Sequence, residues 1–560
     1  MQTLDSPAWN SRIRIAFWII GICCGGITAY TTRYFVNGDA IAYIEMGESL
    51  RWGQWRGLAN LTYSPGYPFL LGIAQTVLHT NPLNELQLLR TVNFACLLCA
   101  MGTCEILMSL VRRALLNSPA GEDKPISLHI IRALGYSMFL VASLVFIRVR
   151  LLNPDMLVFA VVLAVASLLL WIRENSESYR RYILLGLSTG LGYITKSFFL
   201  PFSPIFFVLA GSCSNSFRKA IPRVIVAIIA LVIVAAPLVA ALSCRLGRFS
   251  YGELGPHIYA TLIAGKGEPT TPELLNTYPK VYRFIYGIQC TRPSGFDICY
   301  WHDGLKPVLD LRAQLAVIPD NVSQIFKDTP WLILIIVWYL ILWRLGKIKI
   351  GPLIPPSLFL MLITPAVFGI VFYCLIRMEM RYIAPYLFLG FLAVVVSLRF
   401  SEASHKVYLK AWWLSVTLIS FFLLMVAHSS IDQSIRGLIS TNNRLSYRDS
   451  LREEVIVKDF LDKKGIRKGD LAAVVGSPPV YWARMAGITI VAEIPSLEEF
   501  MNSSEKERRS SLEVLRASNI KAVVAKGDVF AHLNSEGWQL VAGTRDYFVV
   551  LLAEKQLGNG

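Results

Sequence analysis

The sequence predicts a polytopic α-helical membrane protein with about eleven transmembrane helices and a small α/β domain at its C-terminus. Two compositional features predict the membrane class: 54% of the 560 residues are hydrophobic and only 16% are charged. Soluble globular chains carry roughly a quarter charged residues. The mean hydropathy of +0.50 agrees with this class. The third observation is a series of apolar stretches, each long enough to cross a bilayer.

The net charge of +16 follows from where the basic residues lie and needs no nucleic-acid partner. Arg12 and Arg14 precede the first apolar stretch, so we expect a cytoplasmic N-terminus. Each alternate loop after that stretch is basic, beginning with Arg112 and Arg113. An odd number of spans then places the C-terminus outside, and we expect the protein in a plasma or inner membrane.

The predicted spans define a membrane module over residues 1–428, followed by an extracytoplasmic α/β domain over 429–560. No small-residue cleavage site follows the first span, 13–30, so we expect it to be kept as an anchor. Two large outer loops cover 31–87 and 244–329. The remaining spans are 88–111, 128–147, 155–172, 181–195, 198–212, 222–243, 330–345, 352–376, 382–399 and 410–428.

The C-terminal segment alternates helix and strand patterns. An amphipathic helix is expected over 451–464, and "LAAVVGS" and "ITIVAEI" read as buried strands that flank a short helix. A further helix ends near Asn519 before a strand, and "WQLVAG" and "DYFVVLLAE" predict a closing hairpin. "VVGSPP" lacks the Lys-Ser/Thr pair of a phosphate loop. A structural or acceptor-recognition role fits this domain.

Two acidic residues stand at the predicted outer membrane face. Asp39 opens a helix pattern that also contains Glu45, and Asp155 follows Pro154 at the outer end of a span. Both could be N-terminal helix carboxylates, since Asp is a favoured N-cap residue. Alternatively, they could hold a divalent cation such as Mg or Mn, or one could act as a base while the other positions a partner.

The stretch "LTYSPGYPFLLGIAQTVL" predicts a second helix in the first outer loop that does not span the membrane. Pro65 and Pro68 break any helix at its start, and the apolar part that follows is too short to cross. We expect it to lie on the outer leaflet, where Tyr63 and Tyr67 suit the interface.

Several basic residues lie on the predicted outer side, against the positive-inside rule. Among them are Arg150, Lys196 and Arg381. Cations at membrane depth are costly and usually have a partner. That partner could be Asp155, Glu379 or a lipid headgroup. The alternative is a shared anionic ligand, such as a phosphate whose alkyl tail lies in the bilayer.

Four segments in this order carry a family resemblance over about residues 10–400: "GDAIAYIEMGESLRWGQW" with "YSPGYPFLLG", "NPDML", "GLGYITKS" and "RYIAP". The chain resembles the C-type glycosyltransferases, which take sugar from a polyprenyl phosphate. It is most similar to the branch of protein O-mannosyltransferases and aminoarabinose transferases, glycosyltransferase family 39. The resemblance implies the C-type glycosyltransferase fold. It also implies an acceptor that is a glycan, a lipid or a protein.

The resemblance also assigns roles to residues. It implies that Asp39 is the general base of an inverting transfer with an oxocarbenium-like transition state. Lys196, Arg381 and Arg150 would stabilise the leaving lipid phosphate. The expected substrate-lining residues are Tyr63, Tyr67, Glu379 and Tyr382.

One position departs from the family pattern: relatives commonly show an Asp-Glu pair where this chain has Asp39-Ala40. Whether a metal is used is therefore open, and a second carboxylate would have to come from Asp155 or Glu45.

Other function classes remain to be weighed against a transferase. A lipid or sugar transporter, or a flippase, would be expected to show an inverted repeat or paired broken helices at mid-membrane depth, and the sequence shows neither. The two carboxylates also lie at the interface, while a transport site is expected near the midplane. A receptor with an outer sensor domain would leave the outer cations without a role. In the second outer loop, Cys290 and Cys299 could form a disulfide.

Overall fold

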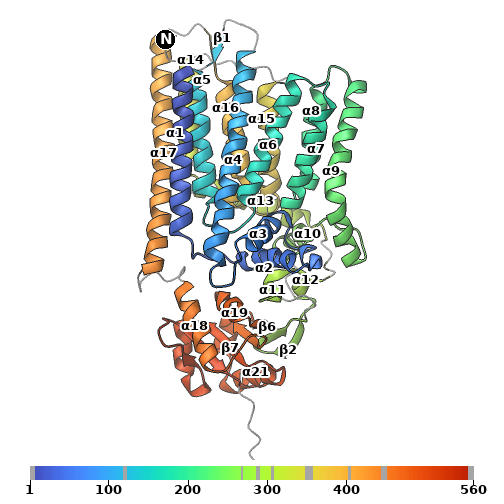
Figure 1. Ribbon diagram of the computed structural model, residues 1–560, viewed down its shortest axis with the longest axis vertical. Helices are drawn as coiled ribbons and strands as arrows, with labels where there is room; N and C mark the ends of the chain where they lie inside the picture. Colours follow the sequence, from blue (N-terminus) through green and yellow to red (C-terminus); the bar gives the residue numbers. More distant parts are fainter. Residues whose placement is uncertain are drawn as a thin grey trace, which may run out of the picture.

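The computed structural model describes residues 7–117, 123–125, 127–265, 269–285, 290–303, 305, 308–346, 357–401, 405–442 and 451–552. A bundle of long, nearly parallel helices stands above a smaller α/β domain (Figure 1). We call the end of the bundle nearest this domain the domain end. Helix α1 begins at the opposite end (Figure 1).

A helix occupies each predicted span, with residues 352–356 of one span lying outside the described residues. By length and composition, seven helices in the described part could cross a membrane, or eight if the bent pair α13 and α14 is one span. The predicted class, a polytopic helical membrane protein with a C-terminal α/β domain, is confirmed. The bundle consists of α1 (Pro7–Thr31), α4 (Glu85–Leu116), α5 (Leu128–Leu140) with its π-helical continuation Val141–Ile147, α6 (Asp155–Glu174), α7 (Tyr179–Thr195), α8 (Phe199–Ser212), α9 (Phe217–Leu246), α14 (Leu332–Gly346), α15 (Leu358–Cys374), α16 (Met380–Ser397) and α17 (His405–Asn442).

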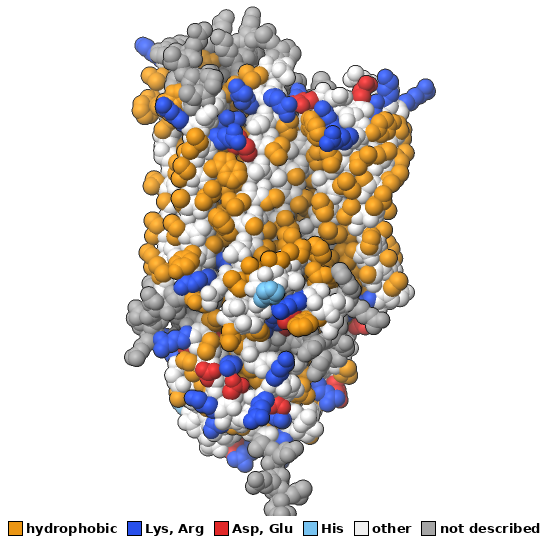
Figure 2. Space-filling view, viewed as in Figure 1, with side chains coloured by type: hydrophobic (Ala, Val, Ile, Leu, Met, Phe, Trp, Pro, Cys, Tyr) orange, Lys and Arg blue, Asp and Glu red, His pale blue; other side chains and the backbone are white. Residues whose placement is uncertain are grey.

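On the face shown in Figure 2, a broad belt of apolar side chains covers the bundle, and charged side chains gather toward its two ends. Large apolar side chains stay exposed on its outer helices, including Val208, Ile233 and Leu424. Such exposure would be unfavourable in water and is expected where lipid is the solvent.

The first loop folds into α2 (Ala40–Arg51), a short 3-10 turn (Trp55–Leu58) and α3 (Gly66–Val77), and α2 and α3 lie across the domain end (Figure 1). As predicted, the helix that follows "YSPGYP" is short and does not span. The two helices touch through glycines, because a Cβ on Gly72 would lie 2.5 Å from the Gly47 carbonyl oxygen. This contact makes α2 and α3 one packed platform beside the bundle.

The second loop also gathers at the domain end. It contains α10 (Leu254–Ile258) with its π-helical continuation Tyr259–Ile263, and then β2 (Glu273–Thr277), β3 (Lys280–Arg283), α11 (Pro293–Phe296), α12 (Cys299–His302) and α13 (Leu311–Asp328). Helix α13 meets α14 at a bend of 80°. Cys290 and Cys299 are both free thiols, so the disulfide considered for this loop is not formed.

The C-terminal segment folds as its patterns predict, with α18 (Leu451–Lys463), α19 (Tyr481–Ala486), α20 (Leu497–Asn502) and α21 (Glu505–Ala517) around the sheet. A 3-10 segment (Asp528–Glu536) precedes the closing hairpin. The strands of this segment are β5 (Leu471–Val475), β6 (Thr489–Ile494), β7 (Ala522–Lys526), β8 (Gln539–Leu540) and β9 (Tyr547–Leu551).

The sheet has seven strands because the second loop contributes two of them. The strand order is β2-β3-β6-β5-β7-β9-β8, with β5 parallel to both β6 and β7. Strand β3 pairs antiparallel with β6, placing Tyr282 opposite Glu493. The sequence did not predict this edge, because β2 is largely exposed and the partner strand of the β2–β3 hairpin lies about 200 residues away in the chain. A separate two-stranded ribbon joins β1 (Asp123–Pro125) to β4 (Arg399–Ser401).

A buried ion cluster joins the α/β domain to the platform. The Arg484 guanidinium on α19 contacts Glu85 at 2.6 Å, Glu48 at 3.0 Å and Glu45 at 3.4 Å. The Thr291 backbone N–H also donates to Glu45, at 2.8 Å. Burial raises the pKa of Glu45, although the adjacent guanidinium opposes this shift. One cation from the C-terminal domain therefore binds carboxylates of both α2 and α4.

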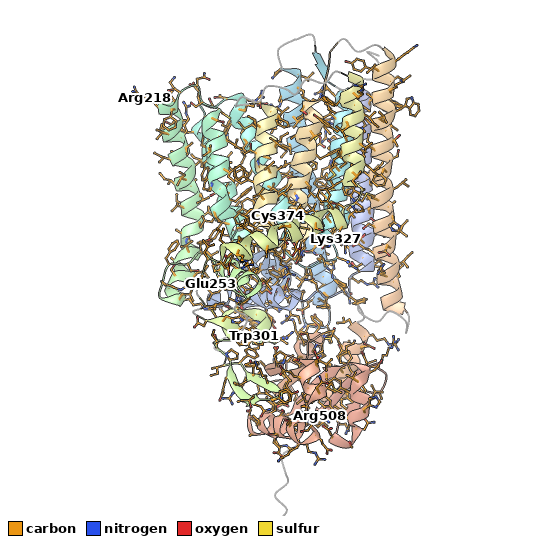
Figure 3. All side chains as sticks on the ribbon, turned by 180° about the vertical axis from the view of Figure 1, so that it is seen from behind. Arg218, Glu253, Trp301, Lys327, Cys374 and Arg508 are labelled. Atoms are coloured by element: carbon orange, nitrogen blue, oxygen red, sulfur yellow. The ribbon has the colours of Figure 1, made fainter. Side chains whose placement is uncertain are left out.

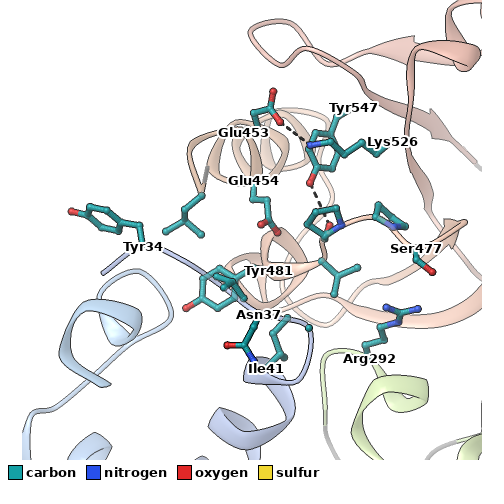
Figure 4. A pocket seen from close by; sticks show the side chains of 16 residues that line it. Tyr34, Asn37, Ile41, Arg292, Glu453, Glu454, Ser477, Tyr481, Lys526 and Tyr547 are labelled. Carbon is teal, nitrogen blue, oxygen red and sulfur yellow. Dashed lines mark hydrogen bonds and ion pairs between the residues drawn. The ribbon is translucent and has the colours of Figure 1, made fainter. Parts of the chain in front are cut away.

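A cavity of about 330 Å³ lies at the same junction, between the start of α2 and the α/β domain (Figure 4). Asn37 and Ile41 line it from the first loop, Arg292 from the second, and Glu454 and Lys526 from the domain. These groups already have partners: Lys526 pairs with Glu453, Arg292 with Glu493, and Glu454 accepts from the Trp482 N–H. Burial raises the pKa of Glu454 to about 7.

We predict that Arg484→Met loosens the domain from the bundle, because removing one partner of a buried ion pair costs roughly 3–5 kcal/mol. The matched control is Arg508→Met. Arg508 forms a similarly buried pair with Glu536 inside the domain, away from the bundle (Figure 3). Spin labels at Gln54 and Glu513 should give a broadened distance distribution in the first variant only. A narrow distribution in Arg484→Met would contradict the prediction.

Candidate functional site

A cavity of about 680 Å³ opens at the domain end, where the platform meets the ends of α6, α7, α15 and α16. Its lining combines apolar and aromatic side chains with six charged ones. The charged lining residues are Asp39, Asp155, Lys196, Arg377, Glu379 and Arg381. Sequence positions more than 300 residues apart therefore meet in one site.

The cations of this cavity form a chain of ion pairs with its acids. Lys196 Nζ donates to Asp155 Oδ1 at 2.8 Å, and Arg381 Nε lies 3.6 Å from Asp155 Oδ2. Arg381 Nε also donates to Glu379 Oε2 at 2.7 Å. The Tyr382 ring stacks beneath Lys196, with Nζ 3.7 Å from the ring centroid. The cations thus have the internal partners expected of charges at membrane depth, and they still face the cavity.

Asp39 occupies the N-cap position of α2, but its side chain makes no capping hydrogen bond. Instead, its Oδ1 accepts from the Tyr63 hydroxyl at 3.1 Å, and only its backbone oxygen serves the helix, through the Tyr43 N–H. Burial raises the pKa of Tyr63, with the neighbouring carboxylate as the second cause, so this phenol stays protonated and donates. Of the two interpretations of Asp39, the structure therefore does not support side-chain capping.

Two polar residues fix the loops that carry Asp39 and Asp155. The Asn37 side chain exchanges two hydrogen bonds with the Leu152 backbone, at 3.3 and 2.9 Å. Buried Arg90 on α4 donates to the backbone oxygens of Phe35 and Arg150. The first loop and the connection before α6, residues 148–154, are thereby held together just before each acid. Sequence reasoning missed both residues, because the Asn-Gly before Asp39 reads as a turn and Arg90 reads as one basic residue at a helix start.

Lys196 is positioned by the contact between α3 and the end of α7. A Cβ on Gly66 would lie 2.8 Å from the Ile194 carbonyl oxygen, so only glycine allows this approach. Lys196 follows directly as the C-cap of α7, and its N–H donates to Gly192. The "PG" of the first loop therefore brings the platform against Lys196, whose half-buried ammonium group lines the cavity.

Three residues expected at the site lie elsewhere. Tyr67 is fully buried under the platform and donates to Asn93. Arg150 sits outside the cavity, with its guanidinium over the Phe35 ring. Glu45 faces the α/β domain in the Arg484 cluster. Tyr63, Glu379 and Tyr382 do line the cavity.

The acids of this site do not fit a divalent cation. Across the described ranges, no three His, Cys, Asp or Glu side chains converge as a metal-ligand group. Both oxygens of Asp155 already face cations, and Ala40 supplies no second acid beside Asp39. The Asp155 carboxylate is better matched to balancing Lys196 and Arg381 than to binding metal.

Comparison with known proteins gives a structural likeness without a sequence match. No protein-family model and no curated protein matches the chain. The crystal structure of ArnT from Cupriavidus metallidurans bound to undecaprenyl phosphate matches with a TM-score of 0.56 at 12% identity, over 98% of this chain and 99% of that one. The apo state of the same protein matches with a TM-score of 0.52 at 13% identity, over 96% and 98% of the two chains. The chain therefore has the fold of ArnT, the C-type glycosyltransferase fold that its sequence motifs predicted.

Proposed function

We propose that the protein is an inverting glycosyltransferase that moves a sugar from a polyprenyl-phosphate donor to an acceptor hydroxyl at the outer membrane face. The observation that carries this proposal is one cavity lined by Asp39, Lys196 and Arg381, in which the Asp39 carboxylate is not used to cap α2. A base and a phosphate site are the two groups this transfer needs. Undecaprenyl phosphate, bound by ArnT of the same fold, is a lipid of the proposed class.

The reaction would proceed in one displacement. The acceptor oxygen attacks the anomeric carbon while Asp39 takes the hydroxyl proton. The bond from the anomeric carbon to the phosphate oxygen breaks, and its electron pair leaves with the lipid phosphate. Lys196 and Arg381 stabilise the charge that develops there. Tyr63, bound to Oδ1, would hold the carboxylate in its orientation.

We predict that Asp39→Asn abolishes transfer while leaving folding and donor binding intact, because the amide cannot accept the proton. General-base contributions are roughly 10²–10⁴-fold. The measurement is the initial rate of sugar transfer in membrane vesicles. The matched control is Asp303→Asn, an exposed carboxylate of the second loop that lies outside this cavity. Unchanged turnover in Asp39→Asn would reject Asp39 as the base. A wild type that transfers no sugar would instead favour the alternative, a transporter or flippase.

We predict that Lys196→Ala and Arg381→Ala each weaken polyprenyl-phosphate binding roughly tenfold or more, since a hydrogen bond to a charged group contributes about 1.5–3 kcal/mol. Binding of radiolabelled lipid to purified protein measures this effect. Arg248→Ala is the control, because Arg248 pairs with Glu253 beside the cavity but does not line it. Normal lipid binding by either variant would remove that residue from the phosphate site.

The proposed orientation places the N-terminus in the cytoplasm and the α/β domain outside. After the native exposed cysteines are replaced, an impermeant thiol reagent should label engineered cysteines at Gln54 and Glu513 in intact cells. A cysteine at Asn117, at the far end of α4, should react only after the membrane is opened. The reverse labelling pattern would invert the topology.

A further inference from the structure

We infer that Asp155 is a selectivity residue that keeps the cavity from retaining the spent lipid phosphate. This inference rests on the proposed function and concerns the difference between its two lipids. A polyprenyl-phosphate sugar is a phosphodiester with one negative charge. The polyprenyl phosphate left after transfer is a monoester with a charge of about −1.5 to −2 at neutral pH. A transferase must bind the first lipid and let go of the second.

A bare pair of cations would do the opposite, because the more highly charged lipid would be bound more tightly. The cavity is not bare. Among the described residues, the charged side chains that line it are three cations and three carboxylates, so its formal charge is zero when all are ionised. Asp155, which pairs with both Lys196 and Arg381, is the most buried of these carboxylates. Only 4% of its side chain is exposed.

Asp155 cannot easily leave this position when a lipid arrives. It is the first residue of α6 and follows Pro154, whose ring fixes the backbone there. Its N–H donates to the Asn153 side chain at 3.2 Å. Both carboxylate oxygens face cations. A phosphate bound by Lys196 and Arg381 must therefore share them with a fixed negative charge. Each additional charge on the phosphate gains attraction from the cations and repulsion from Asp155.

The charge balance gives the order of events. During transfer, the acceptor proton moves to Asp39 as the phosphate gains its extra negative charge, so the total charge of cavity and lipid stays constant. When Asp39 then loses this proton to solvent, the dianionic lipid remains in a cavity that no longer compensates it. Asp155 makes this state unfavourable, and the monoester leaves. The carboxylate thus favours product release without touching the sugar.

The test uses two probes with the same tail: a polyprenyl monophosphate and its methyl diester, which stands for the singly charged donor without its sugar. Their Kd values are measured by equilibrium binding to purified protein in nanodiscs at pH 8. In the wild type, we expect the two values to agree within about threefold, because the cavity has no net charge to reward the dianion. A wild-type preference for the monoester of more than about tenfold would overturn the inference, whatever the variants do.

In Asp155→Asn, the Kd of the monoester should fall at least tenfold and that of the diester by about threefold or less. Transfer should then show correspondingly stronger inhibition by polyprenyl phosphate. Glu253→Gln is the control: it removes a carboxylate next to the cavity that instead binds Arg248 and Ser250. If Asp155→Asn changes the Kd of both probes by the same factor, Asp155 has no selectivity role, and the proposed transferase function is unaffected. Failure of the wild type to bind either probe would overturn both.

Discussion

The site depends on one electrostatic constraint: ammonium and guanidinium groups at the edge of a bilayer need a counter-charge. Asp155 supplies it for Lys196 and Arg381, at 2.8 and 3.6 Å. These three residues belong to the ends of α6, α7 and α16, so the ion pairs also fix the level at which those helices end. The same geometry keeps cations available to a ligand while the empty protein remains folded.

Around this centre, polar contacts between distant segments hold the acids in place. Asn37 ties the first loop to the connection before α6, and Arg484 ties α2 and α4 to the C-terminal domain. Glu45 sits at this second junction. The first loop, which carries Asp39, is thus held in place from the membrane side and from the soluble side. Neither Asn37 nor Arg484 lines the cavity that contains Asp39, so both act through the position of α2.

Hydrophobic patterning was sufficient for the parts of the fold that depend on local sequence. The spans, the helix at 451–464 and the strands of the C-terminal segment all appear where the patterns placed them. The meeting of Lys196, Arg381 and Asp155 followed from placing them on one face of the membrane. The sequence could not predict where the side chains of Glu45 and Tyr67 point. The direction of each side chain depends on how α2 and α3 are rotated about their axes when they pack. The β2–β3 edge needed a partner strand about 200 residues away, which no local pattern reports.

The shared sheet joins two parts of the chain that are far apart in sequence, the second loop and the C-terminal domain. Strands β2 and β3 are synthesised between two membrane spans, yet their neighbour β6 emerges only after the last span is complete. The domain therefore cannot finish folding until every span has been inserted. Exchanging the C-terminal domain for that of a relative would also remove β6, the partner of β3. We therefore expect the C-terminal domain and the second loop to be inherited together. In a chain truncated before β6, the backbone groups of β3 would stay unpaired, and quality-control proteases could recognise this exposed edge.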